Sequence, residues 1–273
     1  MNKFMNILGG CFLTSILMVI ATGHALAGGL EDTSEQAFID ADFETEPSAN
    51  ITNPWWTLPG GSEFLYYAET EDECLWNLIE VLGTTNEFFG SYAGTDARIV
   101  LDREWADEDC IYEDFDDVYE NIEPAETTYD WYAQDLARNI WYMGEDTRDE
   151  EGSSEGSFVA GCNGAEAGIV ILGDPSKGAF YQQEFLEEEA EDWGKVLNFK
   201  IYDEVECMKT KEWTPLEPGE VEHKFYCDGE LVLIEELKGK TVIVELIENT
   251  WGTPDWPDVG EDTPNPIPQC EDD

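Results

Sequence analysis

Apolar and polar residues alternate in short runs along most of this chain, and glycine, proline or asparagine separates the runs. A period of two is the pattern of a half-buried β-strand. Strands are therefore predicted in SEFLYYAE (62–69), CLWNLIEVL (74–82), ARIVLDREW (97–105), GIVIL (168–172) and both halves of ELVLIEELKGKTVIVELIE (230–248). The pattern predicts an all-β, mainly antiparallel fold, built as a single curved sheet or a barrel-like domain with short helical insertions.

Two segments fit this pattern less clearly. EFLEEEAEDWGKVL (184–197) is rich in good helix formers, but strand pairing within a meander is expected to override that propensity. The acidic stretch 107–126 is compatible with a strand or a helical turn around residues 110–119.

The run DWYAQDLARNIWYMGED (130–146) predicts a β-hairpin centred near Ala137, with Tyr132 opposite Tyr142. Simple alternation places Gly144 on the same face as Tyr142. Aromatic residues then lie on both faces, and the hairpin is predicted to be packed on both sides.

The hairpin also carries candidates for ligand contact, because aromatic rings and amides are common in binding sites. Core packing by the same large aromatics is the competing explanation. His223 is the one histidine after residue 27, so any serine–histidine triad would need it; a packed strand residue is the alternative. The candidate binding residues are Trp131, Gln134, Trp141, Tyr142 and His223.

The ends of the chain differ in composition from its middle. Residues 1–27 combine Lys3, an apolar core and Ala25-Leu26-Ala27, which predicts a signal peptide cleaved before Gly28. Residues 28–53 are predicted to be an acidic, flexible N-terminal arm, 54–250 the β-rich domain, and 251–273 a tail rich in proline and aspartate.

The charge is strongly negative, with 13 Lys and Arg against 63 Asp and Glu and a formal net charge of −50. Such a field repels phosphate, which argues against nucleic acid and anionic membranes as partners. It attracts cations, and divalent cations are candidate partners. High solubility alone is the competing explanation for this surface.

Cysteine usage points to an oxidising compartment. Six of the seven cysteines follow residue 27, and no C-x-x-C motif occurs. An even count in an exported chain predicts disulfides, with connectivity left open by the sequence. Cys207 and Cys227 are equidistant from the turn near Glu217, so a hairpin there would place them opposite each other as a cross-strand disulfide.

Carboxylates are the remaining candidates for chemistry. A glycosidase needs two facing carboxyl groups, and the candidates are Glu145, Asp146, Glu184, Glu191 and Asp192. Clusters of acids in loops suit Ca²⁺, which prefers hard oxygen ligands, although the EF-hand spacing is absent. The candidate metal ligands are Asp107, Asp109, Asp146 and Asp149.

Several motifs resemble those of a family of exported bacterial proteins. They are DWYAQD, NIWY and GE in the 130–146 run, and TKEWTPLEPG followed by VEHK at 210–224; the resemblance spans roughly residues 53–247. The turn residues LAR, the cysteines, the acidic loops and the tail depart from the family pattern. The resemblance implies an exported β-rich domain and brings no catalytic residue.

Together these features predict an exported, acidic, non-enzymatic binding or surface-associated protein, with Ca²⁺ as a candidate stabilising ion. A carbohydrate hydrolase with a carboxylate pair is one alternative. The other is an assembling surface subunit that self-associates by adding the acidic arm to a neighbour's sheet edge.

Overall fold

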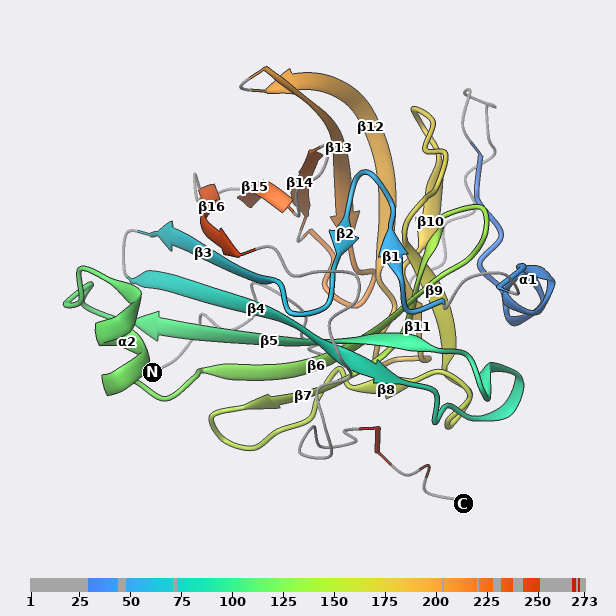
Figure 1. The fold of residues 1–273 in the computed structure, drawn as a ribbon, viewed down its shortest axis with the longest axis horizontal. Coiled ribbons are helices and arrows are strands. Elements are labelled where there is room, and N and C mark those ends of the chain that lie inside the picture. The colour runs from blue at the N-terminus through green and yellow to red at the C-terminus, as the bar shows by residue number, and fades with distance from the viewer. Residues whose placement is uncertain are drawn as a thin grey trace.

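One long, strongly curved antiparallel sheet makes up most of the protein (Figure 1). The computed structural model describes residues 29–43, 48–70, 73–202, 204–219, 221–227, 232–237, 243–250, 267–268 and 270. The predicted signal peptide and nearly all of the C-terminal tail lie outside these residues. No helix in the described part of the chain is long and apolar enough to cross a membrane.

The strands follow one another in a meander, as the short alternating runs predict. In the first half they are β1 (Ile51–Thr52), β2 (Thr57–Leu58), β3 (Glu63–Glu69), β4 (Cys74–Thr85), β5 (Ala97–Asp107), β6 (Glu126–Gln134), β7 (Ile140–Asp149) and β8 (Phe158–Val159). In the second half they are β9 (Glu166–Ile171), β10 (Phe180–Gln182), β11 (Glu184–Phe185), β12 (Trp193–Tyr202), β13 (Val205–Trp213), β14 (Glu222–Cys227), β15 (Val232–Leu237) and β16 (Ile243–Thr250). The helical pieces are α1 (Glu35–Asp40), α2 (Phe115–Asn121) and a 3-10 turn at Gly90–Tyr92. The all-β, mainly antiparallel prediction is confirmed, and the stretch 184–197 contains strands in place of a helix.

The sheet runs in the order β10-β12-β13-β14-β15-β16-β3-β4-β5-β6-β7-β9-β11, with β8 beside β7. Its two ends meet because β10 pairs with β12 while β11, two residues further on, pairs with β9. Residues 180–185 thus join the ends into a barrel-like sheet. Gly168 permits this closure, since a Cβ at that position would overlap the backbone of Gln183.

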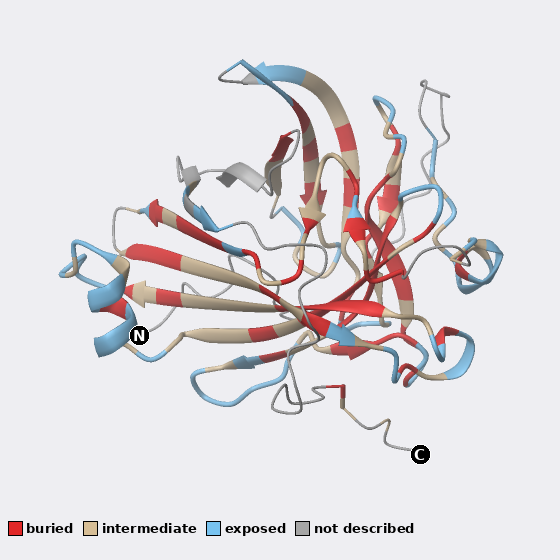
Figure 2. Cartoon of the chain, viewed as in Figure 1, coloured by how far each residue is buried: buried red, intermediate tan, exposed pale blue. Residues whose placement is uncertain are grey.

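The two faces of the sheet differ. Leu65, Trp76 and Trp105 lie on the outer face, where α2 and the preceding loop cover them through Phe115 and Val118. The inner face carries apolar residues mixed with many acids. Figure 2 shows buried residues concentrated where the long strands cross near the middle of the molecule.

The N-terminal segment belongs to the core, which corrects the prediction of a loosely attached arm. Phe38 of α1 is 3% exposed and packs against Tyr92 and Trp141. Leu30 forms a parallel bridge with Phe180, so this segment extends a strand edge of its own chain. Residues 29–43 are therefore packed against the protein's own sheet, with Phe38 buried.

The β1–β2 hairpin lies against the inner face, between strands that are far apart in the sheet order (Figure 1). The Trp56 ring is 4.8 Å from that of Tyr132 on β6 and 6.5 Å from that of Tyr226 on β14. Trp55 lies 5.5 Å from Phe199 on β12. These contacts fill one part of the interior with aromatic rings.

The β6–β7 hairpin has the expected register at its tip, with Tyr132 opposite Tyr142. Next to it, however, Trp131 is opposite Gly144, so Met143 is an extra residue in β7. This β-bulge corrects the simple alternation of faces, because it moves Gly144 off the face of Tyr142. It also places Glu145 on that face.

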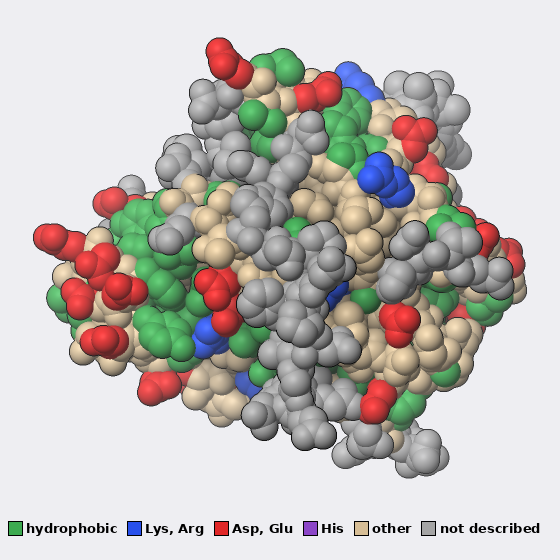
Figure 3. All heavy atoms as spheres, viewed as in Figure 1, with side chains coloured by type: hydrophobic (Ala, Val, Ile, Leu, Met, Phe, Trp, Pro, Cys, Tyr) green, Lys and Arg blue, Asp and Glu red, His purple; other side chains and the backbone are tan. Residues whose placement is uncertain are grey.

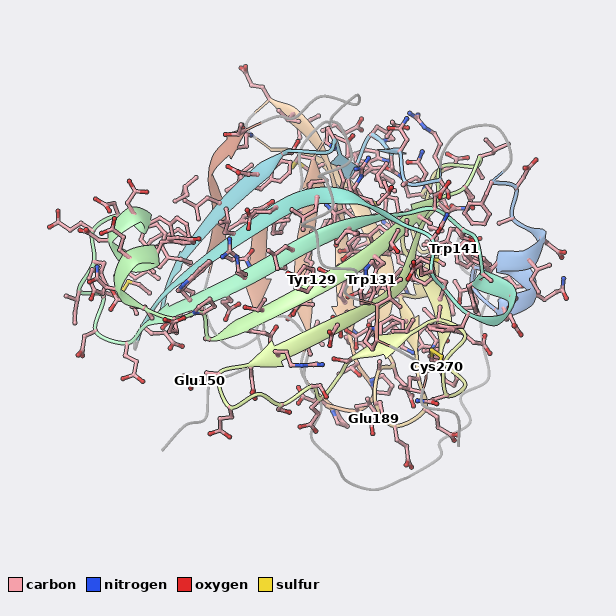
Figure 4. All side chains as sticks on the ribbon, turned by 60° about the horizontal axis from the view of Figure 1, so that its bottom comes forward. Tyr129, Trp131, Trp141, Glu150, Glu189 and Cys270 are labelled. Atoms are coloured by element: carbon pink, nitrogen blue, oxygen red, sulfur yellow. A yellow bond between two sulfur atoms is a disulfide. The ribbon has the colours of Figure 1, made fainter. Side chains whose placement is uncertain are left out.

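Three disulfide bonds join described residues. They link Cys74 to Cys110, Cys162 to Cys270, and Cys207 to Cys227; Cys270 is labelled in Figure 4. Cys207 and Cys227 are direct partners in the β13–β14 register, as the hairpin argument anticipates. Disulfides persist in oxidising compartments, so these bonds indicate that the protein is exported.

Candidate functional site

Two carboxyl groups and a phenol form the centre of the candidate site. Asp130 on β6 and Glu145 on β7 are direct partners across the ladder. The Tyr142 hydroxyl oxygen lies 2.5 Å from Asp130 Oδ1 and 2.8 Å from Glu145 Oε2. A hydroxyl has a single proton to donate, so one of these contacts requires a proton on the carboxyl group instead.

The electrostatics agree with a shared proton. Burial, together with the charge of Asp102, raises the pKa of Asp130 to about 8. Burial and the charge of Asp130 raise the pKa of Glu145 above its ordinary range. Like charges held close together away from water cannot all be ionised at low cost.

Two further acids come from the segment that closes the sheet. Burial makes the largest contribution to the raised pKa of Glu184, and the charges of Asp192 and Glu145 raise it further. Burial and the charge of Glu222 raise the pKa of Asp192 to about 6. We call Asp130, Glu145, Glu184 and Asp192 the acidic cluster. Asp130 is buried, and the other three residues are partly exposed.

Glu212 on β13 lies beside this cluster and has a full set of partners. It accepts hydrogen bonds from Thr210 (2.7 Å), Tyr226 (2.9 Å) and Gln183 (3.3 Å), and the Lys224 ammonium is 3.3 Å away. The charge of Lys224 also offsets part of the rise in the pKa values of Asp102, Glu184 and Asp192. This lysine on β14 therefore acts across the interior on β5 and β11.

Further acidic residues lie on the inner face, toward the far end of β5 and β6. Glu104 and Glu126 are direct partners in the ladder. Burial and the charge of Glu126 raise the pKa of Glu104 to about 8, while burial and the charge of Asp102 raise that of Glu126 to about 7. Asp102 accepts a hydrogen bond from Asn77, and burial raises its pKa to about 6.

Of the candidate binding residues, Tyr142 lies in the acidic cluster. Trp131 and Trp141 are 0% and 2% exposed, and Figure 4 places Trp141 at the end of the sheet near α1. The Trp141 indole donates to Asp135, and Trp131 packs against Phe88. These two tryptophans lie in the core, where their contacts are with Asp135 and Phe88.

The other two candidates also lie elsewhere. Gln134 exchanges hydrogen bonds with the Thr52 backbone and hydroxyl (2.9 and 3.1 Å), which anchors β1 to the sheet. His223 lies between Glu222 and Lys224 on β14, so alternation turns its side chain to the outer face.

The candidate metal ligands are not assembled into a site. Asp107 accepts the Tyr112 N–H, Asp109 is exposed, Asp146 pairs with Arg148, and Asp149 accepts N–H bonds within its own turn. Among the described residues, no three His, Cys, Asp or Glu side chains are placed to hold one metal ion. In the described part of the chain these four acids are therefore not brought together: Asp107, Asp146 and Asp149 serve separate turns or an ion pair, and Asp109 is exposed.

Of the five carboxylates proposed for a glycosidase, three lie together and two lie apart. Glu145, Glu184 and Asp192 are brought together, whereas Asp146 faces the other way and Glu191 accepts the Glu188 N–H. Sequence reasoning missed Asp130 and Glu212. For Asp130 a signal existed, since it shares a face with Tyr132 in the predicted hairpin.

No protein-family model and no curated protein sequence matches the chain. Among solved structures, one similar chain is a protein from Bacteroides fragilis NCTC 9343, described as exported and as having a YmcC-like fold. The two align over 71% of this chain and 98% of that one, with 6% sequence identity and a TM-score of 0.34. A likeness at this level identifies neither a family nor an activity.

Proposed function

We propose that this exported protein binds a positively charged organic ligand at the acidic cluster. The observation that carries the proposal is that Asp130 and Glu145 share the Tyr142 hydroxyl, while the charges of Glu184 and Asp192 also act on this pair. Four separate segments supply these groups, so the arrangement is a product of the tertiary fold.

A cation suits this arrangement because buried carboxylates need a compensating charge. In the free protein, protons supply part of it, as the raised pKa values of Asp130 and Glu145 indicate. A ligand ammonium could take the place of those protons. Since no described trio of ligands suits a metal ion, an organic cation that spreads its contacts over several carboxylates fits better.

A test must distinguish binding at the acidic cluster from the general attraction of cations to the negatively charged surface. Figure 3 shows acidic side chains scattered over the surface, and these also attract cations. We therefore compare D130N/E145Q with E108Q/D109N, which replaces one aspartate and one glutamate at two exposed positions. Isothermal titration of the exported chain with spermidine at pH 8 measures both.

We expect D130N/E145Q to weaken spermidine binding at least tenfold, since hydrogen bonds and ion pairs to charged groups contribute about 1.5–3 kcal/mol each. The surface variant should retain nearly all of the affinity at 0.15 M salt, where exposed charges are screened. Equal losses in the two variants, or no binding by the wild type, would contradict the proposal.

A glycosidase is the second candidate, because two facing carboxyl groups are present. The Asp130 and Glu145 oxygens lie 2.5 and 2.8 Å from one Tyr142 atom, so they are close to each other, and retaining enzymes hold their two carboxyl groups roughly 5–5.5 Å apart. Against it, the Tyr142 hydroxyl occupies the space that a sugar would need. Hydrolysis of aryl glycosides by the wild type, lost in D130N and in E145Q, would favour this candidate over binding.

A further inference from the structure

The Glu212 carboxylate on β13 holds a hydroxyl at one of its oxygens and a side-chain amide at the other. The Thr210 hydroxyl donates to Oε1 over 2.7 Å, and the Gln183 amide donates to Oε2 over 3.3 Å. A hydroxyl within hydrogen-bond reach of a carboxylate is the arrangement of a nucleophile and its general base. The Gln183 amide carbon is an electrophile, and its nitrogen is held by the same base.

Two further side chains fix the orientation of this carboxylate. The Tyr226 hydroxyl donates to Oε1 over 2.9 Å, and the Lys224 Nζ lies 3.3 Å from Oε2. A base that is held by additional partners keeps one orientation toward its nucleophile, which is the logic of catalytic triads. Glu212 therefore presents one oxygen to Thr210 and the other to Gln183.

Burial closes this arrangement to dissolved substrates. Thr210 is 0% exposed, Glu212 6% and Gln183 7%. Tyr181, also 0% exposed, lies across Gly194, which is the ladder partner of Glu212. A hydroxyl buried to this extent can react with a neighbouring group of its own chain, and the amide that shares its base is that of Gln183. Exclusion of water also protects an ester from hydrolysis once it has formed.

We infer that Thr210 and Gln183 join in an intramolecular ester bond, with Glu212 as the general base. The Thr210 hydroxyl gives its proton to Glu212, and its Oγ1 forms a bond with Gln183 Cδ. Glu212 passes the proton to Gln183 Nε2, the Cδ–Nε2 bond breaks, and ammonia leaves. One hydroxyl and one amide thus give one ester and one ammonia, with no change of oxidation state. The tertiary structure supplies the high effective concentration that the reaction needs.

The ester links the segment that closes the sheet to a strand in its middle. Gln183 lies between β10, which pairs with β12, and β11, which pairs with β9. A bond from Gln183 to Thr210 on β13 makes this junction covalent. Cross-links restrict the unfolded chain and so stabilise the folded one. Unlike a disulfide, an ester keeps this effect under reducing conditions.

Intact-mass spectrometry of the exported chain, unfolded and with its disulfides reduced, tests the inference. The wild type should be lighter than its sequence mass by one ammonia molecule. T210V lacks the nucleophile and E212Q lacks the base, so both should have their full mass, whereas T210S should again lose ammonia. T128V is the matched control, because Thr128 is a second buried threonine, and its hydroxyl bonds Thr147; this variant should keep the loss.

Tryptic mapping locates the bond. Cleavage after lysine releases Gln183 in peptide 178–195 and Thr210 in peptide 210–211. The two peptides should be recovered joined, and hydroxylamine, which cleaves esters and leaves amides intact, should separate them. A wild-type chain of full mass would overturn the inference. So would a loss of ammonia that persists in T210V, or a hydroxylamine-resistant link from Gln183 to Lys224. Neither result bears on the acidic cluster, which the spermidine titrations test separately.

Discussion

Asp130→Asn tests the physical basis of the acidic cluster through stability. Asp130 is 6% exposed, and its pKa is about 8 in the folded protein against an ordinary value of 3.8. Because the folded pKa is raised, the folded state binds a proton that the unfolded chain releases. The free energy of unfolding is therefore highest below pH 3.8, falls as the pH rises toward 8, and is level above that.

The magnitude follows from the same two values. Each unit of pH above 3.8 costs about 1.4 kcal/mol until the folded group also ionises. At pH 7 the cost reaches roughly 4 kcal/mol, which is an upper limit for this one group. Asparagine has no such cost, and its oxygen can still accept the hydrogen bond from Tyr142.

We therefore expect Asp130→Asn to raise the free energy of unfolding at pH 7 by up to about 4 kcal/mol and to change it little at pH 4. Urea unfolding followed by tryptophan fluorescence at pH 4, 5.5, 7 and 8 measures the effect, with exposed Asp109→Asn as the matched control. A variant that is less stable than the wild type at pH 7, by the same amount as at pH 4, would show that Asp130 is ionised and well paired, contrary to this reasoning. A more stable variant that binds the ligand less well would show that stability is sacrificed for binding.

Three further predictions concern the site and the fold. Spermidine affinity should rise between pH 5 and pH 8 in titration calorimetry, since carboxyl groups with raised pKa values must lose their protons to pair with a cation; a flat profile would contradict the use of these groups. Replacing the Cys207–Cys227 pair with alanines should cost about 3 kcal/mol and replacing Cys162–Cys270 about 5 kcal/mol, because the chain separations are 20 and 108 residues; the reverse order in urea unfolding would contradict the loop-entropy explanation. Gly168→Ala should lower the thermal midpoint by several degrees or prevent folding, because its Cβ would overlap the facing backbone where the sheet closes, whereas a Cβ on Gly29 meets no atoms and Gly29→Ala should cost less.

The neighbourhood of the site could be predicted only in part. Glu145, Glu184 and Asp192 were among the carboxylate candidates, and the register of Tyr132 with Tyr142 followed from alternation about a short turn. The bulge at Met143 could not be foreseen, because an extra residue in one strand has no marker in the local pattern. Without it, Glu145 and Tyr142 would point to opposite faces and their hydrogen bond could not form.

What the sequence by itself determined is local: short alternating runs specify strands, turn residues specify hairpins, and two cysteines equidistant from a turn specify a cross-strand pair. What the tertiary structure decided depends on contacts between distant segments. The closure of the sheet by residues 180–185, the burial of Phe38, and the meeting of Asp130, Glu184 and Asp192 are of this kind. In a chain with 63 acids, composition cannot indicate which carboxylates will face one another. That selection is made when the sheet curves and closes, since only then do side chains from strands far apart in the sequence share one interior.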